Sequence, residues 1–290
     1  MTNEKTGQKL SGILFFAAAI LLISIVDTIC KIFTTELHSL QLVWGYFLGI
    51  NLTLWIFFYC RRERIINLIK TERIVVQSMR PAFLAASITS LFLGLTYLPI
   101  AEATTIGFTA PLFITALSGP ILREKVGIHR WLAVVIGLVG VFVIVRPGGG
   151  LWHWASLMPF IGAIFFAVFQ IITRLLSKTE KTNTTLFYTG LGGFFWTSII
   201  VPFVWITPSL LHWLVFLLTG AMGAVAHLCM ISAFNRAEAS LLAPFNYTKL
   251  LWVSVLGFLV FGDIPSFNMW VGATIIVAAG IYILYRERNT

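Results

Sequence analysis

The chain has 290 residues, of which 58% are hydrophobic and 11% are charged, and its formal net charge is +9. Soluble domains of average composition carry about 25% charged residues, so two soluble domains, which this length would otherwise allow, are excluded. The apolar residues require a lipid environment, and the excess of positive charge has to be explained within it.

Ten apolar runs follow one another along the chain, each close to the length that a helix needs to cross a bilayer. Continuous runs of this kind favour helices over the short, alternating strands of a membrane barrel. The run that starts at Leu10 is followed by many others, so we expect it to span the membrane and not to be a cleaved signal peptide. The expected spans are 11–33, 39–60, 81–98, 102–122, 127–146, 154–177, 183–206, 210–233, 239–262 and 267–285.

The positions of lysine and arginine predict that both termini face the cytoplasm. On this topology 17 of the 20 basic residues lie at cytoplasmic ends of spans, Lys31 and Arg146 lie at outer ends, and Lys249 lies within a span. The net charge is therefore a topology signal, with anionic lipid headgroups as neighbours, and no nucleic acid is expected. The cytoplasmic set is Lys5, Lys9, Arg61, Arg62, Arg64, Lys70, Arg73, Arg80, Arg123, Lys125, Arg130, Arg174, Lys178, Lys181, Arg236, Arg286 and Arg288.

The two halves of the chain resemble each other. TYLPIAEATTIGF (96–108) is similar to SAFNRAEASLLAPF (232–245), and RWLAVVIGLVGVFVIVR (130–146) is similar to MWVGATIIVAAGIYILYR (269–286). We therefore expect five helices in 1–146, a connecting loop at 147–153, and five helices in 154–290. Since five is odd, the second half enters from the opposite side, and such inverted repeats are typical of secondary transporters that open a central site to either face.

Polar residues interrupt the first span on one helical face. Ser24, Asp27, Thr28 and Lys31 are spaced i, i+3, i+4 and i+7. Ionisable groups in lipid face a cavity or a partner. Asp27 and Lys31 either neutralise each other as an i, i+4 pair, with Lys31 reaching outward, or form a gate or coupling pair that acts on the solute, which is the interpretation we favour.

Lys249 lies near the middle of the ninth span, too deep to reach water easily. We expect Lys249 and Asn246 to orient the acidic or polar end of a solute. The alternative is a structural ion pair with Asp27 on another helix, and the two roles are compatible. The expected aromatic walls of this site are Phe245, Tyr247, Trp252 and Phe108.

Weaker candidates complete the site. Gln170 contacts the solute or bridges helices, and Tyr46, like Trp44, is more often a packing aromatic than a ligand. His227 is either a proton relay or a hydrogen-bonded core histidine. Two further pairs of residues concern the helices themselves: Glu102 and Glu238 suit helix starts, and Pro111 and Pro244 can break helices near the site.

The motifs of other functional classes do not occur in the chain. It has no GxxxxGK[ST], HExxH or GxSxG pattern, so we expect neither a nucleotide motor nor an intramembrane enzyme. Cys30, Cys60 and Cys229 are isolated, so neither a metal site nor another cofactor is expected. A scaffold or receptor would need neither an inverted repeat nor a charge deep in the membrane.

The chain resembles bacterial EamA-domain proteins of the drug/metabolite transporter superfamily. The resemblance rests on DTICK (27–31), YLPIAEATTIGFTAPLF (97–113), REKVGIHRWLAVVIGLVGVFVIVRPGGG (123–150), FVWITPSLLHW (203–213) and LLAPFNYTKLLWVSVLGFLVFGDIPS (241–266). It implies an all-α membrane protein with ten transmembrane helices in two inverted five-helix repeats around a central cavity.

Two departures from the family pattern bear on the solute. Members of the family often carry arginine where Tyr46 stands, and often read APFEYTSLLW where this chain reads APFNYTKLLW. At Asn246 a negative charge is lost and at Lys249 a positive one is gained, which favours an anion or zwitterion over a cation.

We therefore expect a monomeric secondary transporter that moves a small organic solute across a bacterial inner membrane by alternating access. Amino acids or related metabolites come first, and a riboflavin-like vitamin or S-adenosylmethionine is the alternative. A proton or a counter-substrate is the expected coupling partner.

Overall fold

The computed structural model describes residues 2–63, 65–110, 112–114, 116–117, 128–145, 153–176, 179–234, 236 and 248–288. Within these residues, all regular structure is helical. The elements are α1 (Thr2–Phe33), α2 (Ser39–Cys60), α3 (Ile65–Ile69), α4 (Ile74–Leu95), α5 (Ile100–Gly107), α7 (Ile128–Val145), the short 3-10 helix η1 (Trp154–Ser156), α8 (Leu157–Leu176), α9 (Thr182–Ile200), η2 (Val201–Val204), α10 (Leu210–Phe234), α12 (Thr248–Phe261) and α13 (Phe267–Arg288). The expected all-helical membrane fold is confirmed.

Six helices are long and apolar enough to cross a bilayer, and they cover Leu10–Phe33, Ser39–Cys60, Ile74–Leu95, Trp154–Thr173, Asn183–Val204 and Leu210–Met230. Four shorter apolar helices, at Ile100–Ile114, Val135–Val145, Thr248–Phe261 and Phe267–Ala279, correspond to the remaining expected spans. The number of ten crossings stays a prediction, because the apolar part of each of these four, within the described residues, is shorter than the roughly 20 residues that a full span needs.

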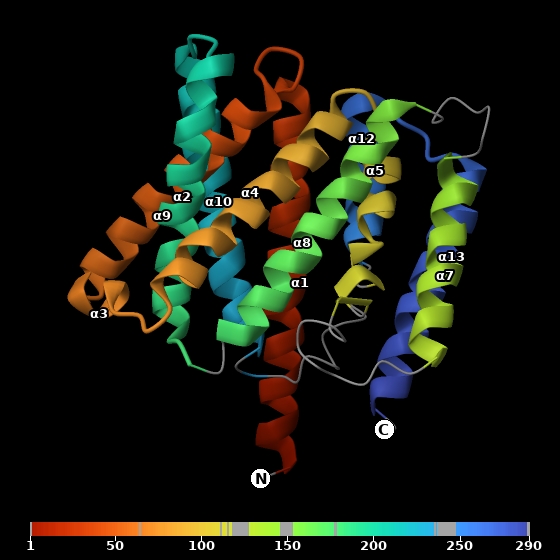
Figure 1. Ribbon diagram of the computed structural model, residues 1–290, viewed down its shortest axis with the longest axis horizontal. Coiled ribbons are helices and arrows are strands. Elements are labelled where there is room, and N and C mark those ends of the chain that lie inside the picture. Colours follow the sequence, from red (N-terminus) through yellow and green to blue (C-terminus); the bar gives the residue numbers. More distant parts are fainter. Residues whose placement is uncertain are drawn as a thin grey trace.

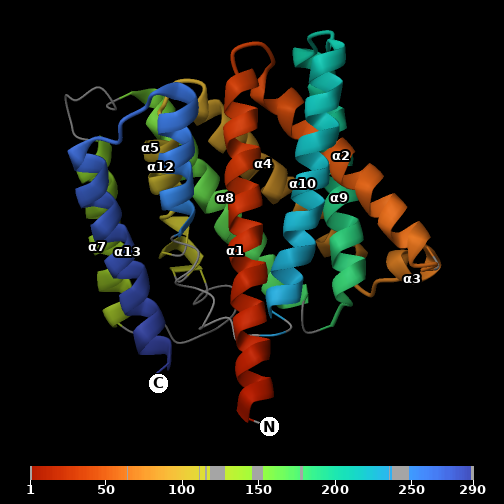
Figure 2. The same cartoon turned by 180° about the vertical axis from the view of Figure 1, so that it is seen from behind.

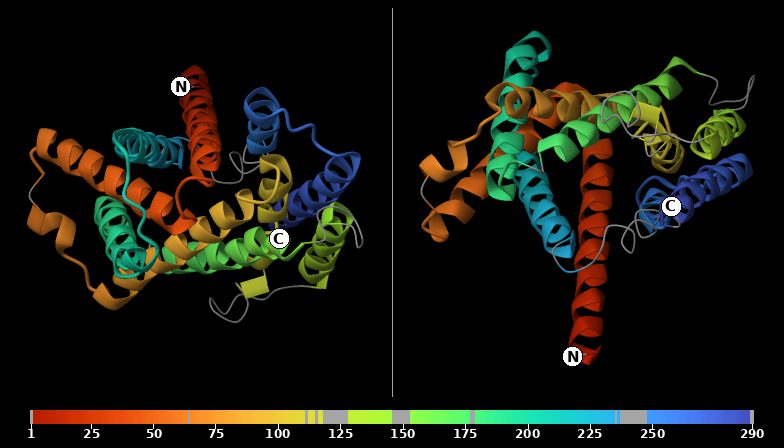
Figure 3. Two further views of the ribbon diagram at one scale, coloured as in Figure 1. Left: turned by 90° about the horizontal axis from the view of Figure 1, so that it is seen from above. Right: turned by 60° about the horizontal axis from the view of Figure 1, so that its bottom comes forward.

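Both termini lie on one side of the bundle (Figure 1). We call this side the terminal face and the other the opposite face. The first turns of α1 project beyond the other helices on the terminal face (Figures 1 and 2). Seen from above, α7 and α13 stand at one end of the molecule, and α2, α3 and α9 stand toward the other (Figure 3).

The helices of one half pack mainly on helices of the other half. The helix α1 packs on α10 and α12, and α8 packs on α4 and α5. In the same way α2 packs on α10, α9 packs on α4, and α7 packs on α13. Each helix of the first half has a counterpart at the same place in the second half: α1 and α8, α2 and α9, α4 and α10, α5 and α12, and α7 and α13. If every helix is exchanged with its counterpart, the same set of packed pairs results. The pattern supports our proposal of two repeats.

One expected boundary is wrong. The third span was placed at 81–98, after Arg80, but α4 starts at Ile74 and contains Pro81. The apolar residues from Ile74 to Val76 extend the helix toward the terminal face, and Pro81 is accommodated within it. The helix therefore carries Arg80 into the bundle, so this arginine is not a loop charge.

Two helix pairs approach each other so closely that their backbones touch at glycine. A methyl group on Gly220 of α10 would collide with the backbone of Gly49 on α2, and one on Gly272 of α13 would collide with the carbonyl oxygen of Gly140 on α7. Small residues permit this approach between membrane helices, where burial from water does not drive association. The two contacts join the halves at the α2–α10 seam and the α7–α13 seam.

The variant Gly220→Ala should lower the free energy of unfolding by about 1–3 kcal/mol, the usual cost of overpacking, because backbone atoms cannot move aside as a flexible side chain can. Thermal unfolding of the purified protein in detergent measures the change. Gly107→Ala is the matched control, since an added methyl group there meets no atom within 4 Å, and it should stay within about 0.5 kcal/mol of the wild type. Equal stability of the two variants would contradict the close α2–α10 contact.

Candidate functional site

The polar face of α1 is turned into the bundle. Ser24, Asp27 and Thr28 are all buried. The two hydroxyl groups donate to backbone carbonyls one turn earlier, Ser24 to Ile20 and Thr28 to Ser24, both at 2.8 Å. These hydroxyls are therefore satisfied within the helix, and the Asp27 carboxylate is left as the charge that needs a partner from elsewhere.

That partner is Lys249. Its Nζ lies 2.7 Å from Oδ2 of Asp27, and the two side chains are only 18% and 8% exposed. The contact has the distance of an ion pair, but its angles are not those of a hydrogen bond, and Oδ2 accepts none. Because α1 packs against α12, the pair joins the first half of the chain to the second. Figure 2 shows the two helices side by side.

Lys31 pairs with a different carboxylate. Its Nζ donates to Oδ2 of Asp263 at 2.8 Å and lies 4.4 Å from the ring centre of Phe261. Asp263 follows the end of α12, so this second ion pair also links α1 to α12, nearer the opposite face. The sequence-based pairing of Asp27 with Lys31 is therefore wrong, because each of the two finds its counterion on α12 or just after it.

Glu102 belongs to the same region. It lies in the first turn of α5, as expected, and is 3% exposed. Its Oε1 accepts a hydrogen bond from the backbone of Ser266 at 3.4 Å, while Oε2 is buried without a partner. Lys31 and Asp263 lie within electrostatic range of Glu102. Three charged groups from α1, α5 and the end of α12 thus meet toward the opposite face.

Tyr46 connects Asp27 to the middle of the bundle. It is buried, lies within electrostatic range of Asp27, and packs its ring over Gly223 of α10. One turn further along α10, His227 lies within electrostatic range of Arg80. His227 therefore adjoins a cation instead of Asp27, which gives no support to a relay between them.

Arg80 is the residue that the sequence reasoning missed. It was counted as a cytoplasmic surface charge, yet it is 2% exposed inside the bundle. Its guanidinium group donates to Oγ1 of Thr173 on α8 and to the carbonyl oxygen of Thr185 on α9, both at 2.9 Å, and also to Oγ1 of Thr189. The apolar residues that precede it from Ile74 were the available signal, since they place Arg80 about 9 Å inside a helix.

The other residues that the sequence suggested for the solute site differ in where they lie. Phe108 packs against the main hydrophobic core, and Gln170 is half-buried on α8. Trp252 lies on the exposed face of α12 with Leu251 and Val255, away from the buried stripe that contains Val253, so this conformation does not support it as a wall of the site. Outside the described residues lie Phe245, Asn246, Tyr247, Glu238, Pro111 and Pro244.

Trp44 is a packing residue, as expected for an aromatic of this type. Its indole nitrogen donates to Ser198 at 2.9 Å, and its ring contacts Trp205 and Trp213 edge to face. These contacts fix the opposite-face ends of α2, α9 and α10 to one another.

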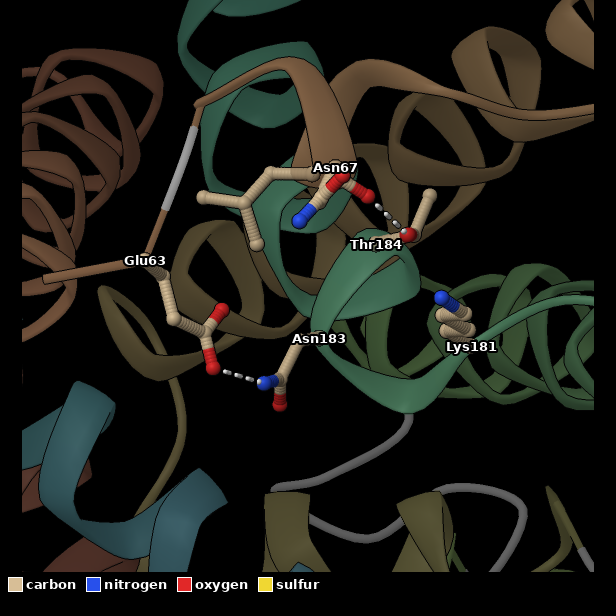
Figure 4. Close-up of a pocket in the computed structure, with 6 residues that line it drawn as sticks. Glu63, Asn67, Lys181, Asn183 and Thr184 are labelled. Carbon is tan, nitrogen blue, oxygen red and sulfur yellow. Dashed lines mark hydrogen bonds between the residues drawn. The ribbon is translucent and has the colours of Figure 1, made fainter. Parts of the chain in front are cut away.

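A surface pocket of about 430 Å³ lies between α3 and the start of α9 (Figure 4). Asn183 donates to Glu63 across it at 2.9 Å, and Lys181 lines its rim. The pocket is on the terminal face, away from the ion pairs of α1, so we do not assign the solute to it. In the part of the chain that the structure describes, no group of three His, Cys, Asp or Glu side chains could hold a metal.

The Asp27–Lys249 pair should show strong energetic coupling. Removing one partner by Asp27→Asn or Lys249→Met leaves a charge in a poorly solvated place and should cost about 3 kcal/mol. The double variant should be more stable than the sum of the single effects predicts by at least about 1 kcal/mol, as measured by thermal unfolding. The more exposed Lys31–Asp263 pair serves as the comparison and should couple by less than about 1 kcal/mol. Additive effects at Asp27 and Lys249 would contradict the pairing.

The model of the EamA-like transporter family matches residues 10–146 and again residues 153–286. A relative named S-adenosylmethionine uptake transporter, from Rickettsia prowazekii, is 28% identical over 290 residues and covers 99% of this chain and 97% of its own. A relative named riboflavin transporter, from Vibrio cholerae, is 34% identical over 206 residues, which are 66% of this chain and 67% of that protein.

A solved structure titled "Crystal structure of protein" shares the fold, with a TM-score of 0.63 and 16% identity over 98% of this chain and 99% of that one. The family match covers nearly the whole chain in two segments, and the relatives are transporters, not enzymes. This chain therefore belongs to the EamA-like transporter family, within the drug/metabolite transporters, and is a multi-pass membrane protein of bacterial type.

Proposed function

We propose that this chain is a secondary transporter that moves a small metabolite with an amino-acid end across the bacterial inner membrane by alternating access. The observation that supports the proposal most is the Asp27–Lys249 pair, which joins the two halves at 2.7 Å in a poorly solvated place. Charges inside a membrane usually mark a solute pathway. A pair whose members come from different halves can separate when the halves move.

The pair suits a solute that carries both charges. In the structure each side chain neutralises the other. A solute with a carboxylate and an ammonium group can exchange with the pair, its carboxylate meeting Lys249 and its ammonium group meeting Asp27. Each charge stays compensated throughout the exchange, so the cost of leaving an ion unpaired in lipid is avoided. Lys31 and Asp263 then act as a gate toward the opposite face.

S-adenosylmethionine is our first candidate for the solute. Its α-amino-acid end matches the charges of Asp27 and Lys249, and two relatives that each cover 99% of this chain are named for its uptake. Its sulfonium group adds a positive charge that this pair does not compensate, so the names of the relatives support this choice more than the net charge of the solute does. A riboflavin-like vitamin is the second candidate, favoured by the 34% identity to the Vibrio cholerae riboflavin transporter. Riboflavin has no carboxylate, so a requirement for the Asp27–Lys249 pair separates the two.

Purified protein in liposomes should accumulate labelled S-adenosylmethionine, and Lys249→Ala should reduce the initial rate at least tenfold, because the solute carboxylate loses its counterion. Riboflavin is measured in parallel. Lys181→Ala is the control, since this exposed lysine lies at the terminal face, and it should transport at the wild-type rate. Full transport by Lys249→Ala would contradict the role of this lysine, and transport of riboflavin alone would replace the first candidate by the second.

The terminal face is proposed to be cytoplasmic. Its described basic residues include Arg61, Arg62, Lys70, Arg73 and Lys181, all of them exposed, whereas Lys31 near the opposite face is paired. Lysine and arginine in short loops favour the cytoplasmic side.

Cys60 provides a native reporter of this orientation, because it is exposed at the terminal-face end of α2 while Cys30 is buried. With Cys30 and Cys229 replaced by alanine, a membrane-impermeant maleimide should label Cys60 in inside-out vesicles and leave it unlabelled in intact spheroplasts. Thr35→Cys, in the exposed loop of the opposite face, should show the reverse pattern in a chain without Cys60. Labelling of Cys60 from outside would overturn the proposed topology.

A further inference from the structure

Arg80 carries a charge that no described side chain compensates. The described ion pairs are Lys31 with Asp263, Lys249 with Asp27, and His212 with Glu36, and none of them includes Arg80. Its hydrogen-bond acceptors are two threonine hydroxyls and one backbone carbonyl, all of them neutral. The aromatic face of Phe169, 4.8 Å away, adds only a weak attraction. A buried ion without a counterion is costly, so a structural role alone gives no reason for a charge here.

The guanidinium group also keeps one donor unused. Its Nε is buried and has no hydrogen-bond partner. The two threonine hydroxyls are already committed, because Thr173 donates to the carbonyl oxygen of Phe169 and Thr189 donates to that of Thr185, both at 2.7 Å. The two hydroxyl oxygen atoms can therefore only accept hydrogen bonds from the guanidinium group. They hold the group in place and leave its Nε without a partner.

A second unused polar atom belongs to a residue one turn away on the same helix. Gln77, one turn before Arg80 on α4, is 0% exposed and donates through Nε2 to Oγ1 of Thr185 at 3.1 Å. Its Oε1 is buried without a partner. Gln77 and Arg80 both contact Thr185 of α9, so they lie on the same face of α4. This face carries an unused acceptor on Gln77 and an unused donor on the positively charged Arg80.

We propose that Arg80 and Gln77 form a second solute site on the terminal side, which takes the carboxylate or phosphate of the solute at Arg80 and an N–H or O–H group at Oε1 of Gln77. The donor–acceptor order matches the carboxylate and ammonium groups of an amino-acid end. The site lies where α4 of the first half meets α8 and α9 of the second, and about 9 Å inside α4. It becomes accessible when the halves separate at the terminal face.

This site is distinct from the Asp27–Lys249 pair. Arg80 lies six residues from the terminal-face end of α4, whereas Asp27 lies six residues from the opposite-face end of α1. A solute with one acidic group would thus meet one cation nearer each face. The inference rests on the proposed transport role, but it does not depend on which solute is carried.

Matched solutes test the proposal by the shift they cause in the unfolding temperature of the full chain in detergent, since a ligand of the folded state stabilises it. The pairs are S-adenosylmethionine and its decarboxylated form, methionine and its methyl ester, and flavin mononucleotide and riboflavin. For the pair that binds most tightly, the member that carries the carboxylate or phosphate should bind wild-type protein at least tenfold better, because a charged hydrogen bond is lost in the other member. We call this difference the anion preference. Arg80→Gln should reduce this preference to less than about threefold.

Three further variants keep the result interpretable. Arg80→Lys retains the charge and should keep part of the preference. Gln77→Met removes the free acceptor together with the Nε2 donor to Thr185, and it should weaken amine-bearing solutes without changing the anion preference. Arg61→Gln is the matched control, because Arg61 is exposed and also lies over a phenylalanine ring, at 5.1 Å. If Arg80→Gln does not fold, the solute preferences of Arg80→Lys and Gln77→Met still test the proposed site.

Two results would overturn the proposal. One is the absence of any anion preference in folded wild-type protein at millimolar solute, including the case in which no solute binds. The other is an unchanged preference in a folded Arg80 variant. If S-adenosylmethionine fails to bind but another anionic solute binds through Arg80, the solute assignment fails while this site stands.

Discussion

A charge inside a bilayer must have a counterion, and this requirement determines how the helices around α1 are arranged. Asp27 on α1 is matched by Lys249 on α12, and Lys31 one turn later is matched by Asp263 just after α12. The two ion pairs join the first half of the chain to the second along one helix–helix contact. Because each pair has one member in each half, the movement of the halves that we propose for transport would have to break these contacts.

Arg80, on the other side of the bundle, is a buried charge without a counterion among the described residues. It lies at the contact of α4 with α8 and α9, which the exchange of halves relates to the contact of α10 with α1 and α2. Where α1 contributes a carboxylate that finds a lysine, α4 contributes a guanidinium group that finds only neutral oxygen atoms. The two halves therefore resemble each other in packing and differ in charge balance, and the imbalance is where the chemistry of a solute can act.

The sequence predicted the helical membrane fold well, because twenty-residue apolar runs have few other solutions. It also pointed to Asp27 and Lys249, since ionisable residues within such runs stand out. The ion pair of Lys249 with Asp27, which the sequence offered as an alternative, is present in the structure. The sequence failed at the partner of Lys31, because the spacing suggested a pair with Asp27 within one helix, whereas packing brings Asp263 to Lys31. It failed at Arg80 because a helix boundary displaced by seven residues turned a buried cation into an apparent loop charge.

The glycine contacts of the α2–α10 and α7–α13 seams restrict how the halves can move. Backbone atoms already touch at Gly49 with Gly220 and at Gly140 with Gly272, and the two seams stand toward opposite ends of the molecule (Figure 3). Neither seam can be compressed, and pulling either one apart would lose its close packing. In the transport mechanism that we propose, the halves would therefore tilt about an axis that runs from one seam to the other. Such a tilt would open the contact between the halves toward one face by the same movement that closes it toward the other.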